Sequence, residues 1–249
     1  MLIPSGRHRP EDLELWAELE EADRAHGERL LRSALPGRAA EAVWRFAAGG
    51  GVYCGLSHGK DSCVLAHLIH LSGLPVPCVH LRVSPSHNPH CDDVRDALLR
   101  LLPGLDYHEI PVDYGDVYRR GLPDDERDAL TDRLWRAGFA EAARRFGGRH
   151  LSGVRASESG VRKLRMRRWG LSTGGTCCPF GWWTEADVFG YLAAHGLPVH
   201  PNYAMLGGGR YPRDRIRVAE IGDVHGNSRG RAEHEEEYFG DVLRRLRAR

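Results

Sequence analysis

The chain has 249 residues, of which 41% are hydrophobic and 28% charged, a composition that excludes a disordered or fibrous protein. Its formal net charge is only +1, so any attraction for anions must come from local clusters of basic side chains. No signal-peptide pattern begins the chain, and no apolar stretch approaches the ~20 residues needed to cross a bilayer. For this reason no membrane partner is expected. The six cysteines include no CxxC pair, which favours a reduced, cytoplasmic setting.

The N-terminal part of the chain, residues 1–48, is predicted to be a helical segment. Residues 11–33 place apolar side chains at helical spacing and end before a Pro-Gly pair. A second helix is expected over about 38–48. We treat this segment as separate from the α/β part that follows.

Residues 49–160 alternate short buried-strand patterns with helical patterns. The alternation predicts right-handed βαβ units and a doubly wound, mainly parallel sheet with helices on both faces, a Rossmann-like α/β fold. Ligands in such sheets bind beyond the carboxyl ends of the strands, where Ser57, Arg82 and Arg155 fall. The predicted strands are 51–57, 76–83, 107–112 and 150–154, and the predicted helices are 61–71, 91–102 and 125–146.

Residues 161–249 differ in character and are predicted to form a basic lid followed by helices and loops. Thr184 is suited to cap a helix over 184–195 that Gly196 ends. A glycine-rich loop is expected at 170–176, further loops at 200–232, and a last helix at 233–249. Within this part Trp182, Trp183, Val188 and Tyr191 are interpreted as core residues.

Residues 53–62, Tyr-Cys-Gly-Leu-Ser-His-Gly-Lys-Asp-Ser, place a glycine turn between a predicted strand and a helix. Such a turn directs backbone N–H groups and the positive end of the helix dipole at one point, so it predicts a phosphate site. It is not a Walker A loop, because only three residues separate Gly55 from Gly59 and Asp61 stands where a magnesium-binding hydroxyl is required. A kinase or switch GTPase is therefore disfavoured.

The same segment resembles the S-x-G-K-D-S signature of the PP-loop ATP pyrophosphatase family. This family includes PAPS reductases, the small subunit of bacterial ATP sulfurylase, tRNA thiolation enzymes and the ATP pyrophosphatases of DNA phosphorothioation. Residues 152–159 resemble its G-x-R-x-x-E-S block, and residues 178–203 resemble its P-x-x-x-W-T-x-x-D-V-x-x-Y segment with a closing H/N-P-x-Y. The three blocks occur in the family's order, which implies an adenine nucleotide alpha hydrolase-like fold.

The resemblance implies that ATP is bound with Mg²⁺ and cleaved between its α- and β-phosphates. Asp61 would help to place Mg²⁺, Lys60 would hold the leaving pyrophosphate, and Arg155 would offset charge on the α-phosphate. Two departures are His58, where glycine is commonest, and the absence of Asp-Thr after the second strand. The implied nucleotide-binding residues are Ser57, His58, Gly59, Lys60, Asp61, Ser62, His80, Leu81, Arg82, Gly153 and Arg155.

The run 162–168 holds five cations in seven residues, and it is interpreted as either a solvated helix face or an anion-binding lid. A lid would cover the triphosphate or an acceptor, and nucleic acid is one candidate acceptor. Similarly, His58 is suited either to touch phosphate or to cap the loop. The lid residues are Arg162, Lys163, Arg165 and Arg168.

Cysteine chemistry is the least specific signal in the sequence. Cys177 and Cys178 could relay sulfur as a persulfide, or ligate an iron–sulfur cluster with Cys54, Cys63 or Cys91, although their spacing announces no cluster. Buried, inert thiols are the alternative. A zinc site at His87, His90 and Cys91 lacks a nearby fourth ligand.

The sequence thus favours an ATP pyrophosphatase that adenylylates an acceptor so that sulfur can replace an oxygen. The sulfur donor would be a cysteine desulfurase or a similar partner, as in the DNA phosphorothioation type. A PAPS or APS reductase is the second hypothesis, although no cysteine follows Cys178. A non-catalytic ATP-sensing subunit is the third.

Overall fold

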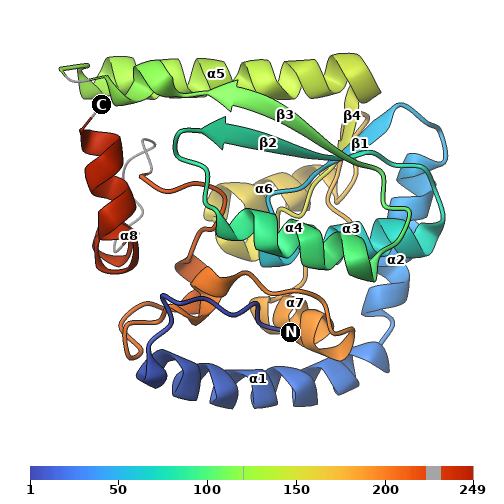
Figure 1. The fold of residues 1–249 in the computed structure, drawn as a ribbon. Helices are drawn as coiled ribbons and strands as arrows, with labels where there is room; N and C mark the ends of the chain where they lie inside the picture. Colours follow the sequence, from blue (N-terminus) through green and yellow to red (C-terminus); the bar gives the residue numbers. More distant parts are fainter. Residues whose placement is uncertain (120, 223–230, 249) are drawn as a thin grey trace.

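The computed structural model describes residues 1–119, 121–222 and 231–248, and its centre is a five-stranded sheet (Figure 1). The order is β3-β2-β1-β4-β5, and each neighbouring pair is parallel. This arrangement confirms the predicted doubly wound α/β fold. The strands are β1 Val52–Gly55, β2 Cys78–Ser84, β3 Tyr107–Asp113, β4 Arg149–Leu151 and β5 Thr176–Cys177.

Helices cover both faces of this sheet. Helix α5 (Asp124–Phe146) lies along one face, and α3 (Lys60–Ser72) and α4 (His90–Leu101) lie on the other (Figure 1). A further layer packs beneath α3, formed by α1 (Pro10–Leu31) and α7 (Glu185–Ala194). The remaining helices are α2 (Leu35–Ala47), α6 (Gly160–Trp169) and α8 (Arg231–Arg247), with short 3₁₀ turns at Gly115–Tyr118, Ala156–Glu158, Pro201–Ala204 and Arg213–Arg215.

Most predicted elements exist with shifted ends. The strand predicted at 51–57 ends at Gly55, because the chain leaves the sheet there to form the phosphate loop. The prediction of a loop at 170–176 was incomplete, since Thr176 and Cys177 pair with β4 as the edge strand β5. Two residues are too few to produce a recognisable period in the sequence. The loop predicted at 200–232 lies partly outside the described residues, at 223–230, as does residue 249 of the last predicted helix.

The helix predicted at 184–195 is well specified. Thr184 accepts a hydrogen bond from the Asp187 backbone at 3.2 Å, and the Asp187 carboxylate accepts one from the Thr184 backbone at 2.7 Å. This reciprocal pair satisfies donors that the first helical turn would otherwise leave free. Of the expected core residues nearby, Trp183, Val188 and Tyr191 are buried. Trp182 is 47% exposed, so its assignment to the core was wrong.

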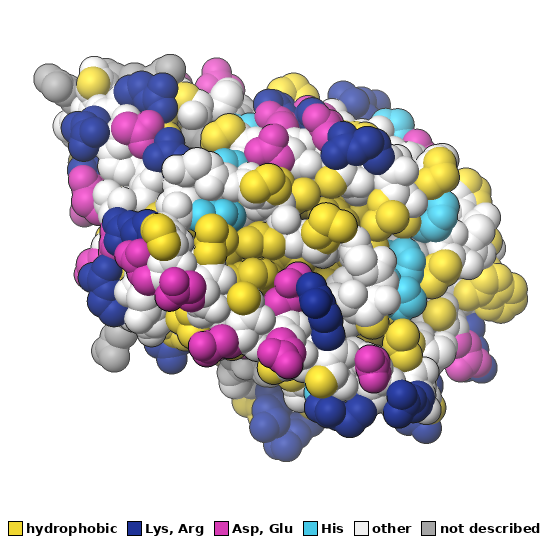
Figure 2. All heavy atoms as spheres, turned by 60° about the horizontal axis from the view of Figure 1, so that its bottom comes forward, with side chains coloured by type: hydrophobic (Ala, Val, Ile, Leu, Met, Phe, Trp, Pro, Cys, Tyr) yellow, Lys and Arg dark blue, Asp and Glu magenta, His cyan; other side chains and the backbone are white. Residues whose placement is uncertain are grey.

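The face of the molecule that includes α1 carries acidic and basic side chains in alternation around a hydrophobic central area (Figure 2). Ion pairs such as Arg24–Glu20 and Arg45–Glu41 join neighbouring turns of the helices in this region. Within the described ranges, no helix combines the length and the apolarity that crossing a bilayer would demand.

Candidate functional site

A cleft of about 290 Å³ opens at the carboxyl ends of the central strands. It lies where the strand order reverses, between β1 and β4, the position at which open α/β sheets bind ligands. Its size is near the lower end of the roughly 300–1,000 Å³ typical of small-molecule sites. The walls come from the ends of β1 and β4, from the first half of β2, from the start of α3 and from α5.

One wall is the loop from Ser57 to Ser62, which connects β1 to α3. Ser57, Asp61 and Ser62 line the cleft. The Ser62 hydroxyl donates to the Gly59 carbonyl at 3.0 Å, which closes the turn. The N-cap residue Gly59 provides no side-chain cap for α3, although the Tyr203 hydroxyl accepts from the Lys60 amide. The remaining amides of the first turn retain the capacity to bind an anion.

Two buried cations flank Asp61 at this loop. Its Oδ1 accepts from Arg155 Nε at 2.6 Å, and its Oδ2 lies 3.0 Å from Lys60 Nζ. Burial opposes the charge on Lys60, but Tyr203 and Asp61 outweigh it and raise the Lys60 pKa above its ordinary value. Two cations and one carboxylate leave the group with a net positive charge, which suits a polyphosphate.

The second and third sequence blocks both contact this loop. Gly153 sits against Asp61 so closely that an added Cβ would lie 3.0 Å from the Asp61 Cβ. Tyr203, at the end of the third block, accepts a hydrogen bond from the Lys60 backbone at 3.2 Å. Tyr203 is buried, and its ring also lies 5.3 Å from Lys60 Nζ. Sequence reasoning had not assigned this tyrosine a role, although the H-P-x-Y pattern pointed to its position.

The donor set does not fit a magnesium site held by Asp61. Both of its carboxylate oxygens are engaged by cationic side chains. No group of three or more His, Cys, Asp or Glu residues within the described ranges could hold a metal ion. Mg²⁺ is often bound by few protein ligands together with substrate phosphates, so the phosphates would supply most of its ligands at this site.

Another wall of the cleft comes from β2, which carries part of the implied nucleotide site. Val79, His80 and Leu81 line the cleft. Opposite them α5 contributes Trp135 and Phe139, whose rings meet edge to face with centroids 5.4 Å apart. These two aromatics form an apolar surface suited to a flat base, and sequence reasoning missed them because nothing local marks which face of α5 borders a cleft.

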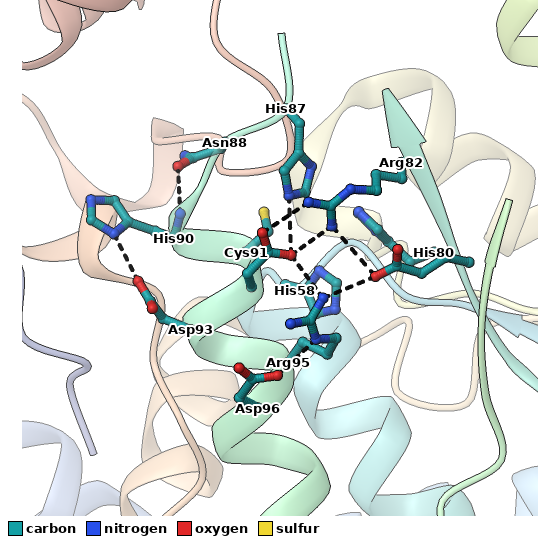
Figure 3. Close-up of polar contacts among 12 residues, drawn as sticks. His58, His80, Arg82, His87, Asn88, His90, Cys91, Asp93, Arg95 and Asp96 are labelled. Atoms are coloured by element: carbon teal, nitrogen blue, oxygen red, sulfur yellow. Dashed lines mark hydrogen bonds and ion pairs between the residues drawn. The ribbon is translucent and has the colours of Figure 1, made fainter. Parts of the chain in front are cut away.

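Arg82 does not join the cleft, so its predicted contact with the nucleotide is not supported by its position. Its guanidinium makes a bidentate pair with Asp92 of α4, at 2.6 and 2.9 Å, and lies 3.5 Å from Glu109 (Figure 3). Arg95 binds the same two carboxylates. Residues on one strand alternate between faces, and Arg82 therefore points to the α4 side of the sheet.

His58 does not line the cleft described above. Its backbone has φ of +60°, a left-handed conformation that glycine adopts more easily. The ring is buried beside His80 (Figure 3), with its centroid 4.4 Å from that of His80. The centroid of Tyr107 lies 5.9 Å away. Burial lowers the pKa of His58 well below its ordinary value, so the ring is neutral at pH 7. The two roles expected for this side chain, phosphate contact and loop capping, stay predictions.

The residues considered for zinc are engaged elsewhere. His87 lies 3.3 Å from Asp92, and His90 lies 3.1 Å from Asp93 (Figure 3). Cys91 Sγ contacts the Val218 carbonyl at 3.4 Å. These side chains do not converge on one point.

Only one of the expected lid residues reaches the cleft. Arg162 lines it and pairs with Glu158, another cleft residue. Lys163 and Arg168 are exposed along α6. The predicted lid is thus a helix whose first turn borders the cleft.

The six cysteines are free and buried. Burial raises the pKa of Cys177 to about 11 and raises that of Cys178 as well. Because the thiolate is the reactive form, these shifts oppose a sulfur relay in this conformation. Cys178 packs with Ala156 and Met166 beneath α6.

No family model matches the sequence, and no curated protein matches it. Among solved structures the chain is similar to NMN synthetase from Francisella tularensis, with 15% sequence identity and a TM-score of 0.43. The similarity covers 90% of this chain and 95% of that one. It is too distant to support an argument about function, which must come from the site itself.

Proposed function

We propose that this chain is an ATP pyrophosphatase that transfers an adenylyl group to an acceptor. The observation that carries the proposal is the convergence of Lys60, Arg155 and the first-turn amides of α3 beside the cleft at the switch point of the sheet. The β- and γ-phosphates would bind at the loop. The α-phosphate would then lie towards the cleft, with the base against Trp135 and Phe139.

The proposed reaction is an in-line displacement. An acceptor oxygen attacks the α-phosphorus, and the bond from this phosphorus to the bridging α,β-oxygen breaks. Pyrophosphate leaves with the electron pair, stabilised by Lys60 and the loop amides. Sulfur from a donor such as a cysteine desulfurase would then displace AMP from the activated acceptor. The protein contributes position and charge, and Mg²⁺ would arrive with the phosphates.

Product analysis with ATP labelled in the α-phosphate tests this proposal. We expect the label in an adenylylated acceptor when Mg²⁺ and acceptor are present, together with unlabelled pyrophosphate, and in free AMP once a sulfur donor is added. Lys60→Ala should lower the rate by about 10²–10³-fold, as expected when a donor to the leaving group is removed. Arg100→Ala, an exposed residue on α4, is the matched control. ADP and phosphate as products, or a Lys60→Ala protein with undiminished AMP formation, would refute the assignment.

Two alternatives give different outcomes in the same preparation. A PAPS or APS reductase would release sulfite from its nucleotide with a thiol donor. That activity needs a reactive cysteine, and the buried Cys177 and Cys178 offer none in this conformation. An ATP-sensing subunit would bind ATP without turnover.

A further inference from the structure

Helix α6 differs from the other helices in how little of it is buried. Only Met166 is buried, whereas Val161, Leu164 and Trp169 are 78%, 66% and 56% exposed. Large apolar side chains that remain exposed together next to a cleft are candidates for a contact with a partner. The helix therefore presents an unpartnered face.

The charges on α6 define the kind of partner. Five of the chain's 35 basic residues fall within its ten positions, which include no Asp or Glu. Cations three or four residues apart repel each other, as in the pairs Lys163–Arg167 and Arg165–Arg168. On the face drawn in Figure 2, by contrast, acidic and basic side chains lie interspersed. A polyanion would relieve this repulsion.

The outer face of α6 has a defined order of side chains. At about 100° per residue, Val161, Leu164 and Arg168 lie opposite the buried Met166. Arg165 and Arg167 fall on either side of this row. Val161 and Leu164 would contact unpaired bases along this row, and Arg168 together with the cations on both flanks would bind phosphates.

The end of the helix adds a stacking surface. Trp169 is exposed, with the Arg168 guanidinium 4.6 Å from its ring centroid. Exposed aromatic rings beside arginine bind unpaired bases without regard to sequence. The first turn of the helix borders the cleft through Arg162. A strand bound along α6 would therefore pass the cleft mouth.

We infer that α6 is the docking surface for a single-stranded nucleic acid, which presents the acceptor group to the cleft. The identity of the acceptor rests on the proposed function, but the docking surface does not. A triphosphate is a poor occupant, because Arg162 is the one cation of α6 that lines the cleft. An anionic membrane is disfavoured, because a ten-residue helix with so few apolar side chains buries little area in a bilayer.

The test is fluorescence anisotropy of the whole protein with labelled 20-nucleotide oligothymidine and oligouridine, without ATP, over a series of salt concentrations. The triple variant Lys163→Gln, Arg167→Gln, Arg168→Gln should lower the slope of log K against log salt by about 2, given roughly 0.7 per phosphate contact on single strands. Trp169→Ala should weaken binding about tenfold. The charge-matched control replaces three exposed cations elsewhere, Arg29, Arg38 and Arg100, by Gln.

Each outcome decides the inference. An equal loss in the control would show only general charge attraction and would overturn it, as would duplex DNA bound as tightly as single strands. Binding to vesicles with anionic lipid but not to oligonucleotides would assign the helix to membranes instead. Because ATP is absent, failure here leaves the AMP assay standing, and failure of that assay leaves this surface standing.

Discussion

Acidification should destabilise the protein through His80. This side chain is 2% exposed, and its Nδ1 lies 2.9 Å from the Leu56 carbonyl, to which it donates as the neutral tautomer. Its Nε2 is buried without a hydrogen-bond partner within the described residues. Burial lowers the pKa of His80 from 6.5 to about 4, with the nearby His87 adding to the effect. The folded state therefore resists the proton that the unfolded state accepts.

The sign and size of this change in stability follow from the difference in proton binding between the folded and unfolded states. Between pH 6.5 and 4 the unfolded chain binds the proton and the folded chain does not, so stability falls as the pH falls through this window and levels off below it. For these two pKa values the His80 contribution lost between pH 7.5 and 5 is about 2 kcal/mol. Other buried histidines, such as His58, add to the total loss.

Urea unfolding at pH 7.5 and pH 5 measures this loss. The variant His80→Gln keeps an amide donor but cannot titrate, so its stability should fall by about 2 kcal/mol less than that of the wild type over this interval. Arg100→Gln, which alters an exposed residue on α4, should retain the wild-type pH dependence. If His80→Gln and the wild type lose the same stability on acidification, the reasoning about this buried ring is refuted.

Two further substitutions test how the sequence blocks meet. Gly153→Ala should displace the loop, because the new Cβ would lie 3.0 Å from the Asp61 Cβ. We expect the free energy of unfolding, measured with urea, to fall by roughly 1–3 kcal/mol. ATP binding, measured by calorimetric titration, should also weaken. Tyr203→Phe keeps the packing but removes the acceptor for the Lys60 amide at 3.2 Å, so it should cost about 1 kcal/mol; unchanged stability would show that water replaces this contact freely.

Much of the fold follows from local patterns in the sequence. The alternation of strands and helices, the turn before Lys60 and the Thr184 cap each depend on residues a few positions apart, and the structure contains all three. Strand β5 was missed because two residues carry no period. Trp182 was misplaced because it precedes the helix cap, where helical spacing no longer decides which side chain faces inward.

Side-chain partners were harder to predict because they depend on distant elements. Arg82 and Arg155 both follow strand patterns and both looked suited to phosphate. In the structure Arg82 pairs with the carboxylates of Asp92 and Glu109, since its side chain leaves the sheet on the α4 side. Arg155 instead pairs with Asp61, a residue 94 positions earlier in the chain. No local pattern distinguishes these two arginines.

The pairing of Arg155 with Asp61 also constrains how the site can work. Arg155 is 3% exposed and its Nε is held by the Asp61 carboxylate, so it cannot approach an α-phosphate through that atom unless the pair opens. A buried charge that loses its partner is costly, whereas exchange of a carboxylate for a phosphate oxygen keeps the charge compensated. The ion pair therefore holds Arg155 and Lys60 in place. Under the proposed function, a bound polyphosphate would replace Asp61 as the partner of both cations.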